Sequence, residues 1–205
     1  MRTFQSRNAW FLKFMWKTLV QGHVDYCSQL YFPAKSSDME KIENLQRNFT
    51  KKIPEVRHLD YWARLKHLKL LSQERRMERY RIIYVWKILE GLTPNCGIET
   101  THSNRRGREV KIPPVKGIRG KIQTLREASF QIHGPRLFNS LPKSVRSMTN
   151  VTVEDFKGSL DKFLEILPDE PKVDNYVPSA CNILTASPSN SIIDLAKSVR
   201  ARRPG

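Results

Sequence analysis

The chain has 205 residues, of which 39% are hydrophobic, and it carries 36 Lys and Arg against 20 Asp and Glu, a formal net charge of +16. It has neither an apolar run of roughly 18 residues, which a membrane-spanning helix needs, nor a signal-peptide core near its start, so we expect an intracellular protein of the nucleus or cytoplasm that is not secreted. Residues 1–100 hold 18 basic and 10 acidic residues, residues 101–150 hold 11 and 2, and residues 151–205 hold 7 and 8. This field favours a phosphate-rich partner such as RNA or DNA, with a solvated basic surface or an anionic membrane as the alternatives.

Large apolar residues at helical spacing predict a first helix over residues 8–21, ended by Gly22. They are Trp10, Phe11, Phe14, Met15, Leu19 and Val20. Lys13 and Lys17 should face outward. This helix has more large hydrophobic surface than a small bundle readily covers, which indicates that another protein unit covers part of it.

A second helix should begin at a capping box, Ser37-Asp38-Met39-Glu40, and stop before Pro54. Its expected apolar stripe consists of Met39, Ile42, Leu45, Phe49 and Ile53.

A short helix and turn over residues 61–71 then lead into a long helix over residues 72–89, which Gly91 terminates. Met77, Tyr80, Tyr84 and Ile88 should hold one side of the long helix, and Arg75 and Arg79 the opposite surface. All four tryptophans (Trp10, Trp16, Trp62 and Trp86) lie in or beside apolar helical patterns, so we expect them to pack in a core rather than to stack on bases.

Residues 95–124 are rich in Gly, Pro and Arg and predict a basic flexible linker or weak hairpin. Residues 125–167 should form a small helical unit that includes a helix capped by Thr152. Residues 168–205 should be a mostly disordered tail in which only residues 192–199 could form a brief helix. The expected fold is therefore mainly α: a small thumb-like bundle over residues 1–94, the basic linker, the second helical unit and the tail.

Several patches of the sequence occur in an order that resembles one family. They are residues 19–27 (LVQGHVDYC), 39–53 (MEKIENLQRNFTKKI), 61–95, which include WKILEGL at 86–92, and 129–142 (SFQIHGPRLFNSLP) followed by 153–164. As an ordered set over residues 14–167 they resemble the segment after the catalytic palm in reverse transcriptases of non-LTR (LINE-like, jockey-type) retrotransposons. Where that family commonly shows Arg-Pro-His-x-x-Tyr-Cys, this chain has Gln21 and Gly22 in place of Arg-Pro and retains His23.

The resemblance implies a thumb and the segment just beyond it, which hold a template-primer duplex as it leaves the palm. Helices suit this task because they present cations to phosphates without reading bases. The implied partners are RNA, DNA or an RNA–DNA hybrid and the palm portion of a reverse transcriptase. The departure at Gln21 argues against a phosphate contact there, and for His23 a structural hydrogen bond is favoured over a substrate contact.

The candidate nucleic-acid-binding residues form three groups: Arg47, Lys51 and Lys52 on the second helix; Arg75, Arg76 and Arg79 on the long helix; and Arg105, Arg106, Arg108, Lys111 and Lys116 in the basic segment. Each group also has an explanation that does not involve nucleic-acid binding. The first could be a solvated face, the second could form ion pairs with Glu74 and Glu78, and the third could be a charged linker.

Polymerase chemistry requires carboxylates that hold two metal ions, and no Asp-Asp dipeptide, hence no Tyr-x-Asp-Asp motif, occurs in the chain. Its three cysteines are far apart, so neither a zinc site nor a disulfide framework is expected. We therefore expect no cofactor, no metal, no small-molecule substrate and no enzymatic activity of the isolated chain. The leading hypothesis is a truncated, non-catalytic fragment of a retrotransposon RNA-directed DNA polymerase; the alternatives are a stand-alone non-specific RNA- or DNA-binding protein and a non-functional pseudogene product.

Overall fold

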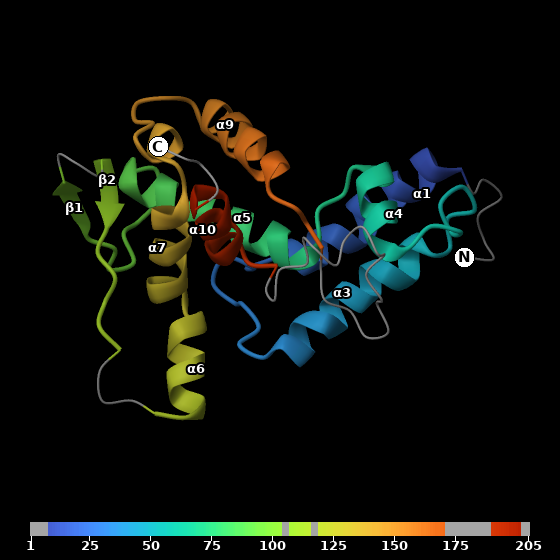
Figure 1. The fold of residues 1–205 in the computed structure, drawn as a ribbon, viewed down its shortest axis with the longest axis horizontal. Coiled ribbons are helices and arrows are strands. Elements are labelled where there is room, and N and C mark those ends of the chain that lie inside the picture. The colour runs from blue at the N-terminus through green and yellow to red at the C-terminus, as the bar shows by residue number, and fades with distance from the viewer. Residues whose placement is uncertain (1–7, 104–106, 116–118, 171–189, 202–205) are drawn as a thin grey trace.

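A computed structural model describes residues 8–103, 107–115, 119–170 and 190–201, and over these ranges the chain is mainly helical, as the sequence predicts (Figure 1). The helices are α1 (Ala9–Met15), the π-helix η1 (Trp16–Gln21), α2 (Gly22–Asp25), α3 (Ser36–Thr50), α4 (Tyr61–Leu68), α5 (Gln73–Leu89), α6 (Lys121–Ala128), α7 (Phe130–Ser140), α8 (Lys143–Arg146), α9 (Val153–Ile166) and α10 (Ile192–Ala201). The strands β1 (Thr100–Ser103) and β2 (Gly107–Val110) pair antiparallel, which realises the hairpin alternative for the basic segment.

The first helical region is longer than the sequence predicts. The Asn8 side chain accepts a hydrogen bond from the Phe11 N–H and caps the start of α1. Gly22 does not end the helix: its φ and ψ angles are −59° and −36°, and the helical path continues through η1 into α2. The chain leaves this path at Tyr26, whose ψ is 123°, and turns at Cys27, whose φ of 54° lies in the left-handed region. An exposed glycine costs a helix only about 1 kcal/mol, and packing on both sides can offset this.

Helix α3 has the predicted place but a different start. It begins at Ser36 after the N-cap residue Lys35, and no side chain caps it, so the expected capping box is wrong. It ends at Thr50, ahead of Pro54, as expected.

The buried face of α3 is partly polar and differs from the predicted apolar stripe. Leu45 is 53% exposed, whereas Glu43 and Gln46 are buried. Glu43 accepts hydrogen bonds from the Tyr61 hydroxyl and from the Gln73 N–H. These hydrogen bonds offset the cost of burying a carboxyl group. The spacing of apolar residues cannot predict that a polar residue lies on the buried face.

Helix α5 has the predicted bounds and runs through the centre of the molecule (Figure 1). The Ser72 hydroxyl caps its start by accepting from the Arg75 N–H, and Gly91 (φ 71°) ends it, with the Leu92 N–H bonded to the Lys87 carbonyl at 2.9 Å. Arg75 is fully buried, so its predicted place on an outer surface is wrong.

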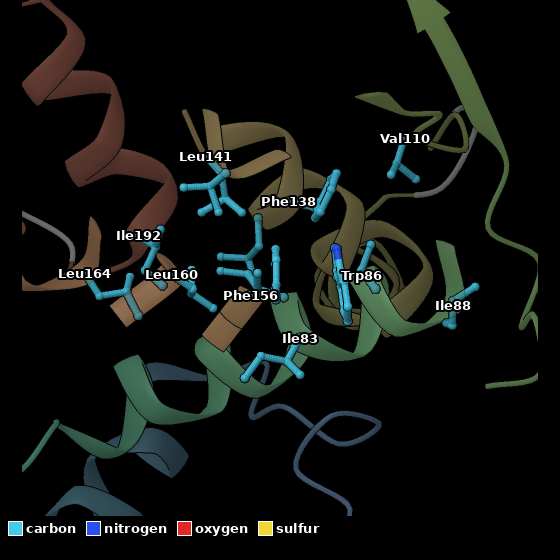
Figure 2. Packing of buried hydrophobic residues seen from close by; sticks show 14 of the residues in the cluster. Ile83, Trp86, Ile88, Val110, Phe138, Leu141, Phe156, Leu160, Leu164 and Ile192 are labelled. Carbon is cyan, nitrogen blue, oxygen red and sulfur yellow. The ribbon is translucent and has the colours of Figure 1, made fainter. Parts of the chain in front are cut away.

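The larger core lies between α5, α7, α9 and α10. Figure 2 shows Trp86 of α5 facing Phe156 of α9, with ring centroids 4.5 Å apart and planes 9° apart. The Trp86 Nε1–H donates to the Met148 carbonyl at 2.9 Å, so the indole is satisfied although it is buried. The Asn139 amide of α7 bonds both backbone groups of Val110 and holds the hairpin against this helix.

The brief helix that the tail sequence allows is α10, and it belongs to the larger core. Ile192 and Leu195 are buried there. Glu78 of α5 accepts hydrogen bonds from the Ser191 hydroxyl at 2.6 Å and the Ile192 N–H at 2.7 Å, which anchors the start of α10. Burial raises the pKa of the Glu78 carboxyl to about 8. Residues 190–201 thus pack mainly against α7 and are anchored to α5 at their start, whereas the rest of the predicted tail, residues 171–189 and 202–205, lies outside the described residues.

A smaller core joins α1, the end of α3 and α4, which lie together at the right of Figure 1. Leu12, Ile53, Val56 and Leu68 are its buried members. This core brings the C-terminal end of α3 next to α1 and α4.

Candidate nucleic-acid interface

The three arginines of α5 that the sequence analysis selects, Arg75, Arg76 and Arg79, are engaged within the chain. Arg75 donates from Nη2 to the carbonyls of Pro168 at 2.8 Å and Asn190 at 3.3 Å, and among the described residues its buried Nε and Nη1 have no partner. Arg79 donates from Nε and Nη2 to Asp161 of α9 at 2.5 and 2.8 Å. Arg79 therefore forms an ion pair, as the alternative explanation predicts, but with Asp161 of α9 and not with Glu74 or Glu78.

Arg76 forms a forked ion pair with Asp25 of α2. Its Nε donates to Oδ1 at 2.9 Å and its Nη2 to Oδ2 at 2.7 Å. Burial alone would lower the pKa of Arg76, but the hydrogen bonds and charge of Asp25 raise it. The guanidinium group is therefore committed to this carboxylate.

The patch that carries part of the family resemblance, residues 19–27, supports this ion pair through Gln21. The Gln21 amide accepts from the Trp16 Nε1–H at 2.8 Å and donates to Asp25 Oδ1 at 3.0 Å and to the Gln73 side chain at 3.2 Å. Gln21 is thus a buried structural residue. His23 is exposed on α2.

The described part of the basic segment is also largely paired. Arg108 forms an ion pair with Glu90 and donates to the Leu89 carbonyl at 2.6 Å. Lys111, on the surface, pairs with Glu99 at 2.7 Å. Arg105, Arg106 and Lys116 lie outside the described residues.

The first predicted group has the most open position. Lys51 and Lys52 are exposed at the end of α3, and Arg47 is half-buried. Close to them Arg64 donates to the Thr50 hydroxyl at 3.2 Å and to the Leu59 carbonyl at 2.7 Å. Burial lowers the pKa of Arg64, and the neighbouring Arg47 charge lowers it further.

Three further lysines meet at the same end of the molecule. Lys13 of α1 donates to the Leu68 carbonyl at the end of α4. Burial lowers the pKa of Lys13, and the positive charges of Lys17 and Lys69 add to the effect. Lys17 and Lys69 therefore lie close enough to Lys13 for their positive charges to act on it. Sequence periodicity predicts that Lys13 and Lys17 face outward but gives no signal that Lys69 joins them.

Six exposed cations lie on the elements and turns that surround the smaller core, and we call them the basic end: Lys17, Lys51, Lys52, Arg57, Lys66 and Lys69. Residues 47–69 contain seven Lys and Arg against two Asp and Glu. Lys66 also lies over the Trp62 ring, 5.4 Å from its centroid. Such an arrangement can hold a polyanion by charge without reading its sequence.

The four tryptophans differ in exposure. Trp16 and Trp86 are buried, as predicted, and Trp62 is half-buried. Trp10 is 74% exposed and lies nearly parallel to the half-exposed Phe14, with centroids 5.9 Å apart, so the prediction of core packing is wrong for Trp10.

The described ranges hold neither a metal site nor a membrane span. Within them, no group of three or more His, Cys, Asp or Glu side chains is placed to hold a metal ion. Nor does any helix there have the length and apolar character needed to cross a membrane.

No protein-family model, curated protein or solved structure matches this chain.

Proposed function

We propose that this chain is the non-catalytic thumb and post-thumb portion of a non-LTR retrotransposon reverse transcriptase and that it holds template-primer nucleic acid through backbone phosphates. The observation that carries the proposal is the basic end, where exposed cations lie on the elements around a small core and Lys17 and Lys69 lie close to Lys13. The ordered sequence patches supply the family, and the positive charge of residues 1–150 supplies the long-range attraction.

The proposed protein partner is the palm of the polymerase. Trp10, Phe14 and Leu19 of the first helical region are 74%, 50% and 56% exposed, and the first two rings are stacked on each other. An apolar face of this kind is costly in water, and a palm packed on it would remove the cost.

A second candidate is a stand-alone RNA- or DNA-binding protein derived from such an element. It is favoured by the closure of α5, whose arginines bond Asp25, Asp161 and the carbonyls of Pro168 and Asn190 rather than facing outward. Because Asp25 and Asp161 already pair with Arg76 and Arg79, these two arginines do not need a partner from the palm.

The test is binding of the purified chain to a labelled RNA–DNA hybrid across a salt series. For the variant carrying Lys17→Ala, Lys51→Ala, Lys52→Ala and Lys69→Ala, we expect the slope of log affinity against log salt to fall by roughly 0.7–0.9 for each phosphate that is no longer neutralised. Lys143→Ala with Lys162→Ala, two exposed lysines on α8 and α9, is the control and should change the slope little. Affinity that does not depend on salt, or no binding at low salt, would overturn the proposal.

Primer extension separates the two candidates. If the chain is a polymerase thumb, adding it to a palm-containing fragment should increase extension, and Trp10→Ala with Phe14→Ala should reduce the gain. If hybrid binding is strong but extension does not change, the stand-alone binder is the better account.

A further inference from the structure

A hollow of about 390 Å³ opens between α2 and α5. Its lining includes Tyr26, Cys27, Tyr80, Tyr84 and Lys87. The volume lies near the lower end of the range of small-ligand pockets, roughly 300–1,000 Å³. The three aromatic rings and one cation of the lining form a combination that suits a flat ligand with a negative charge.

Two of the rings are fixed by their neighbours. The Tyr80 hydroxyl accepts from Arg76 Nη2 at 3.0 Å and lies 3.3 Å from Asp25 Oδ2, and the Arg76 guanidinium is 5.3 Å from the Tyr80 ring centre. Tyr84, one turn further along α5, meets Phe130 edge to face with centroids 5.3 Å apart. Both rings are therefore positioned before any ligand arrives.

The third ring and the cation complete the lining. Tyr26 is 77% exposed, because the chain leaves α2 there and turns at Cys27 with a φ of 54°. Lys87 is half-buried, and no carboxylate of the described residues forms an ion pair with it. Asp25, the acidic residue of the lining, is already neutralised by Arg76.

We propose that this hollow is a binding site for one unpaired nucleobase of a single-stranded segment, with the base stacked on Tyr26 and the adjacent phosphate held by Lys87. Aromatic side chains combined with a cation are how proteins hold single strands without strong sequence preference. A base in a duplex has both faces covered by its neighbours, so only an unpaired one can enter. This site deepens the proposed function and rests on it, because the charged basic end would bring the strand to the protein.

The experiment compares two oligonucleotides of equal length and charge, oligo-dT and a fully abasic analogue, by fluorescence anisotropy with the full chain. We expect oligo-dT to bind about 5- to 150-fold more tightly, since stacking contributes about 1–3 kcal/mol per base. Tyr26→Ala should bring this ratio close to one, whereas Tyr26→Phe should retain it because the ring remains. Lys87→Ala should weaken both oligonucleotides.

The outcomes separate the two proposals. A ratio near one in the unmodified chain would overturn the base site and leave the phosphate grip standing. A ratio above one that Tyr26→Ala does not change would place base binding elsewhere and also overturn this site. No binding of either oligonucleotide at low salt would overturn both the site and the proposed function.

Discussion

Arg79 and Asp161 face each other across α5 and α9 in a two-pronged ion pair, with N–O distances of 2.5 and 2.8 Å. The Arg79 side chain is 16% exposed and that of Asp161 is 44% exposed, so solvent screens the pair in part. On an isolated helix, Arg79 could contact a phosphate. In this fold it joins α5 to α9 instead, through two residues that are 82 positions apart in the chain.

The pair predicts a measurable coupling between these two residues. In a double-mutant cycle with Arg79→Ala and Asp161→Ala, we expect a coupling energy of about 0.5–1 kcal/mol in urea denaturation, because a half-exposed pair is worth no more. The salt dependence of hybrid binding should be the same for Arg79→Ala and the unmodified chain. If instead Arg79→Ala lowers that dependence without destabilising the fold, the side chain contacts phosphate and the ion pair does not persist in solution.

Two helical glycines form a matched pair with opposite expected effects. A Cβ at Gly134 of α7 would lie 3.0 Å from Val85 Cγ2 and 3.2 Å from Phe130 Cε2, whereas a Cβ at Gly158 of α9 would meet no atom within 4 Å. We expect Gly134→Ala to lower the free energy of unfolding by about 1–2 kcal/mol through overpacking of α5 against α7. Gly158→Ala should raise it by about 0.5–1 kcal/mol, since alanine is the better helix former.

Thermal or urea denaturation of both glycine variants measures this difference. Equal effects at the two positions would show that the approach of α7 to α5 in solution is looser than the contact to Val85 requires.

The buried Glu43 predicts that stability falls as pH rises. Burial raises the pKa of its carboxyl to about 8, from an ordinary value of 4.5. The folded chain therefore keeps a proton that the unfolded chain releases, and stability declines as pH rises from about 5 to about 8, by roughly 2–4 kcal/mol. Urea denaturation at these two pH values should show the decline, and Glu43→Gln should reduce it.

Burial also raises the pKa of Glu78, so part of the fall in stability with pH should remain in the Glu43→Gln variant. Glu165→Gln, at an exposed position on α9, is the control and should not alter the pH dependence. The assignment to Glu43 would be refuted if its glutamine variant and the unmodified chain declined equally.

Sequence is a reliable guide wherever local signals agree. Helix α5 is predicted to within a residue because Ser72 caps its start, apolar residues recur along it and Gly91 supplies the left-handed residue that ends it. The same holds for α9, where the Thr152 hydroxyl accepts the Asp155 N–H at 3.1 Å and the apolar period is regular. The signals for each helix lie within or beside that helix, so its bounds can be predicted from one segment of the chain.

The candidate site is harder to predict because it depends on distant contacts. Nothing local distinguishes Arg75, which is buried against the carbonyls of residues 93 and 115 positions away, from Lys51, which is exposed. Similarly, Leu45 matches the apolar stripe of α3 but lies outside, because Glu43 and Gln46 find buried hydrogen-bond partners on α4, α5 and the Leu71 carbonyl. Helical periodicity gives the face that a residue occupies but not the partner that it meets there.

The anchoring of α10 has a consequence for the order in which the chain can fold. Glu78 and Ile192 are 114 residues apart, so α5 is synthesised well before the segment that covers its buried carboxyl group and completes the apolar core around it. Until that segment emerges, the Glu78 carboxyl group lacks the hydrogen bonds from Ser191 and Ile192 that it accepts in the folded chain. Contacts of such long range close slowly, so we expect the docking of α10 to be a late step in the completion of the larger core.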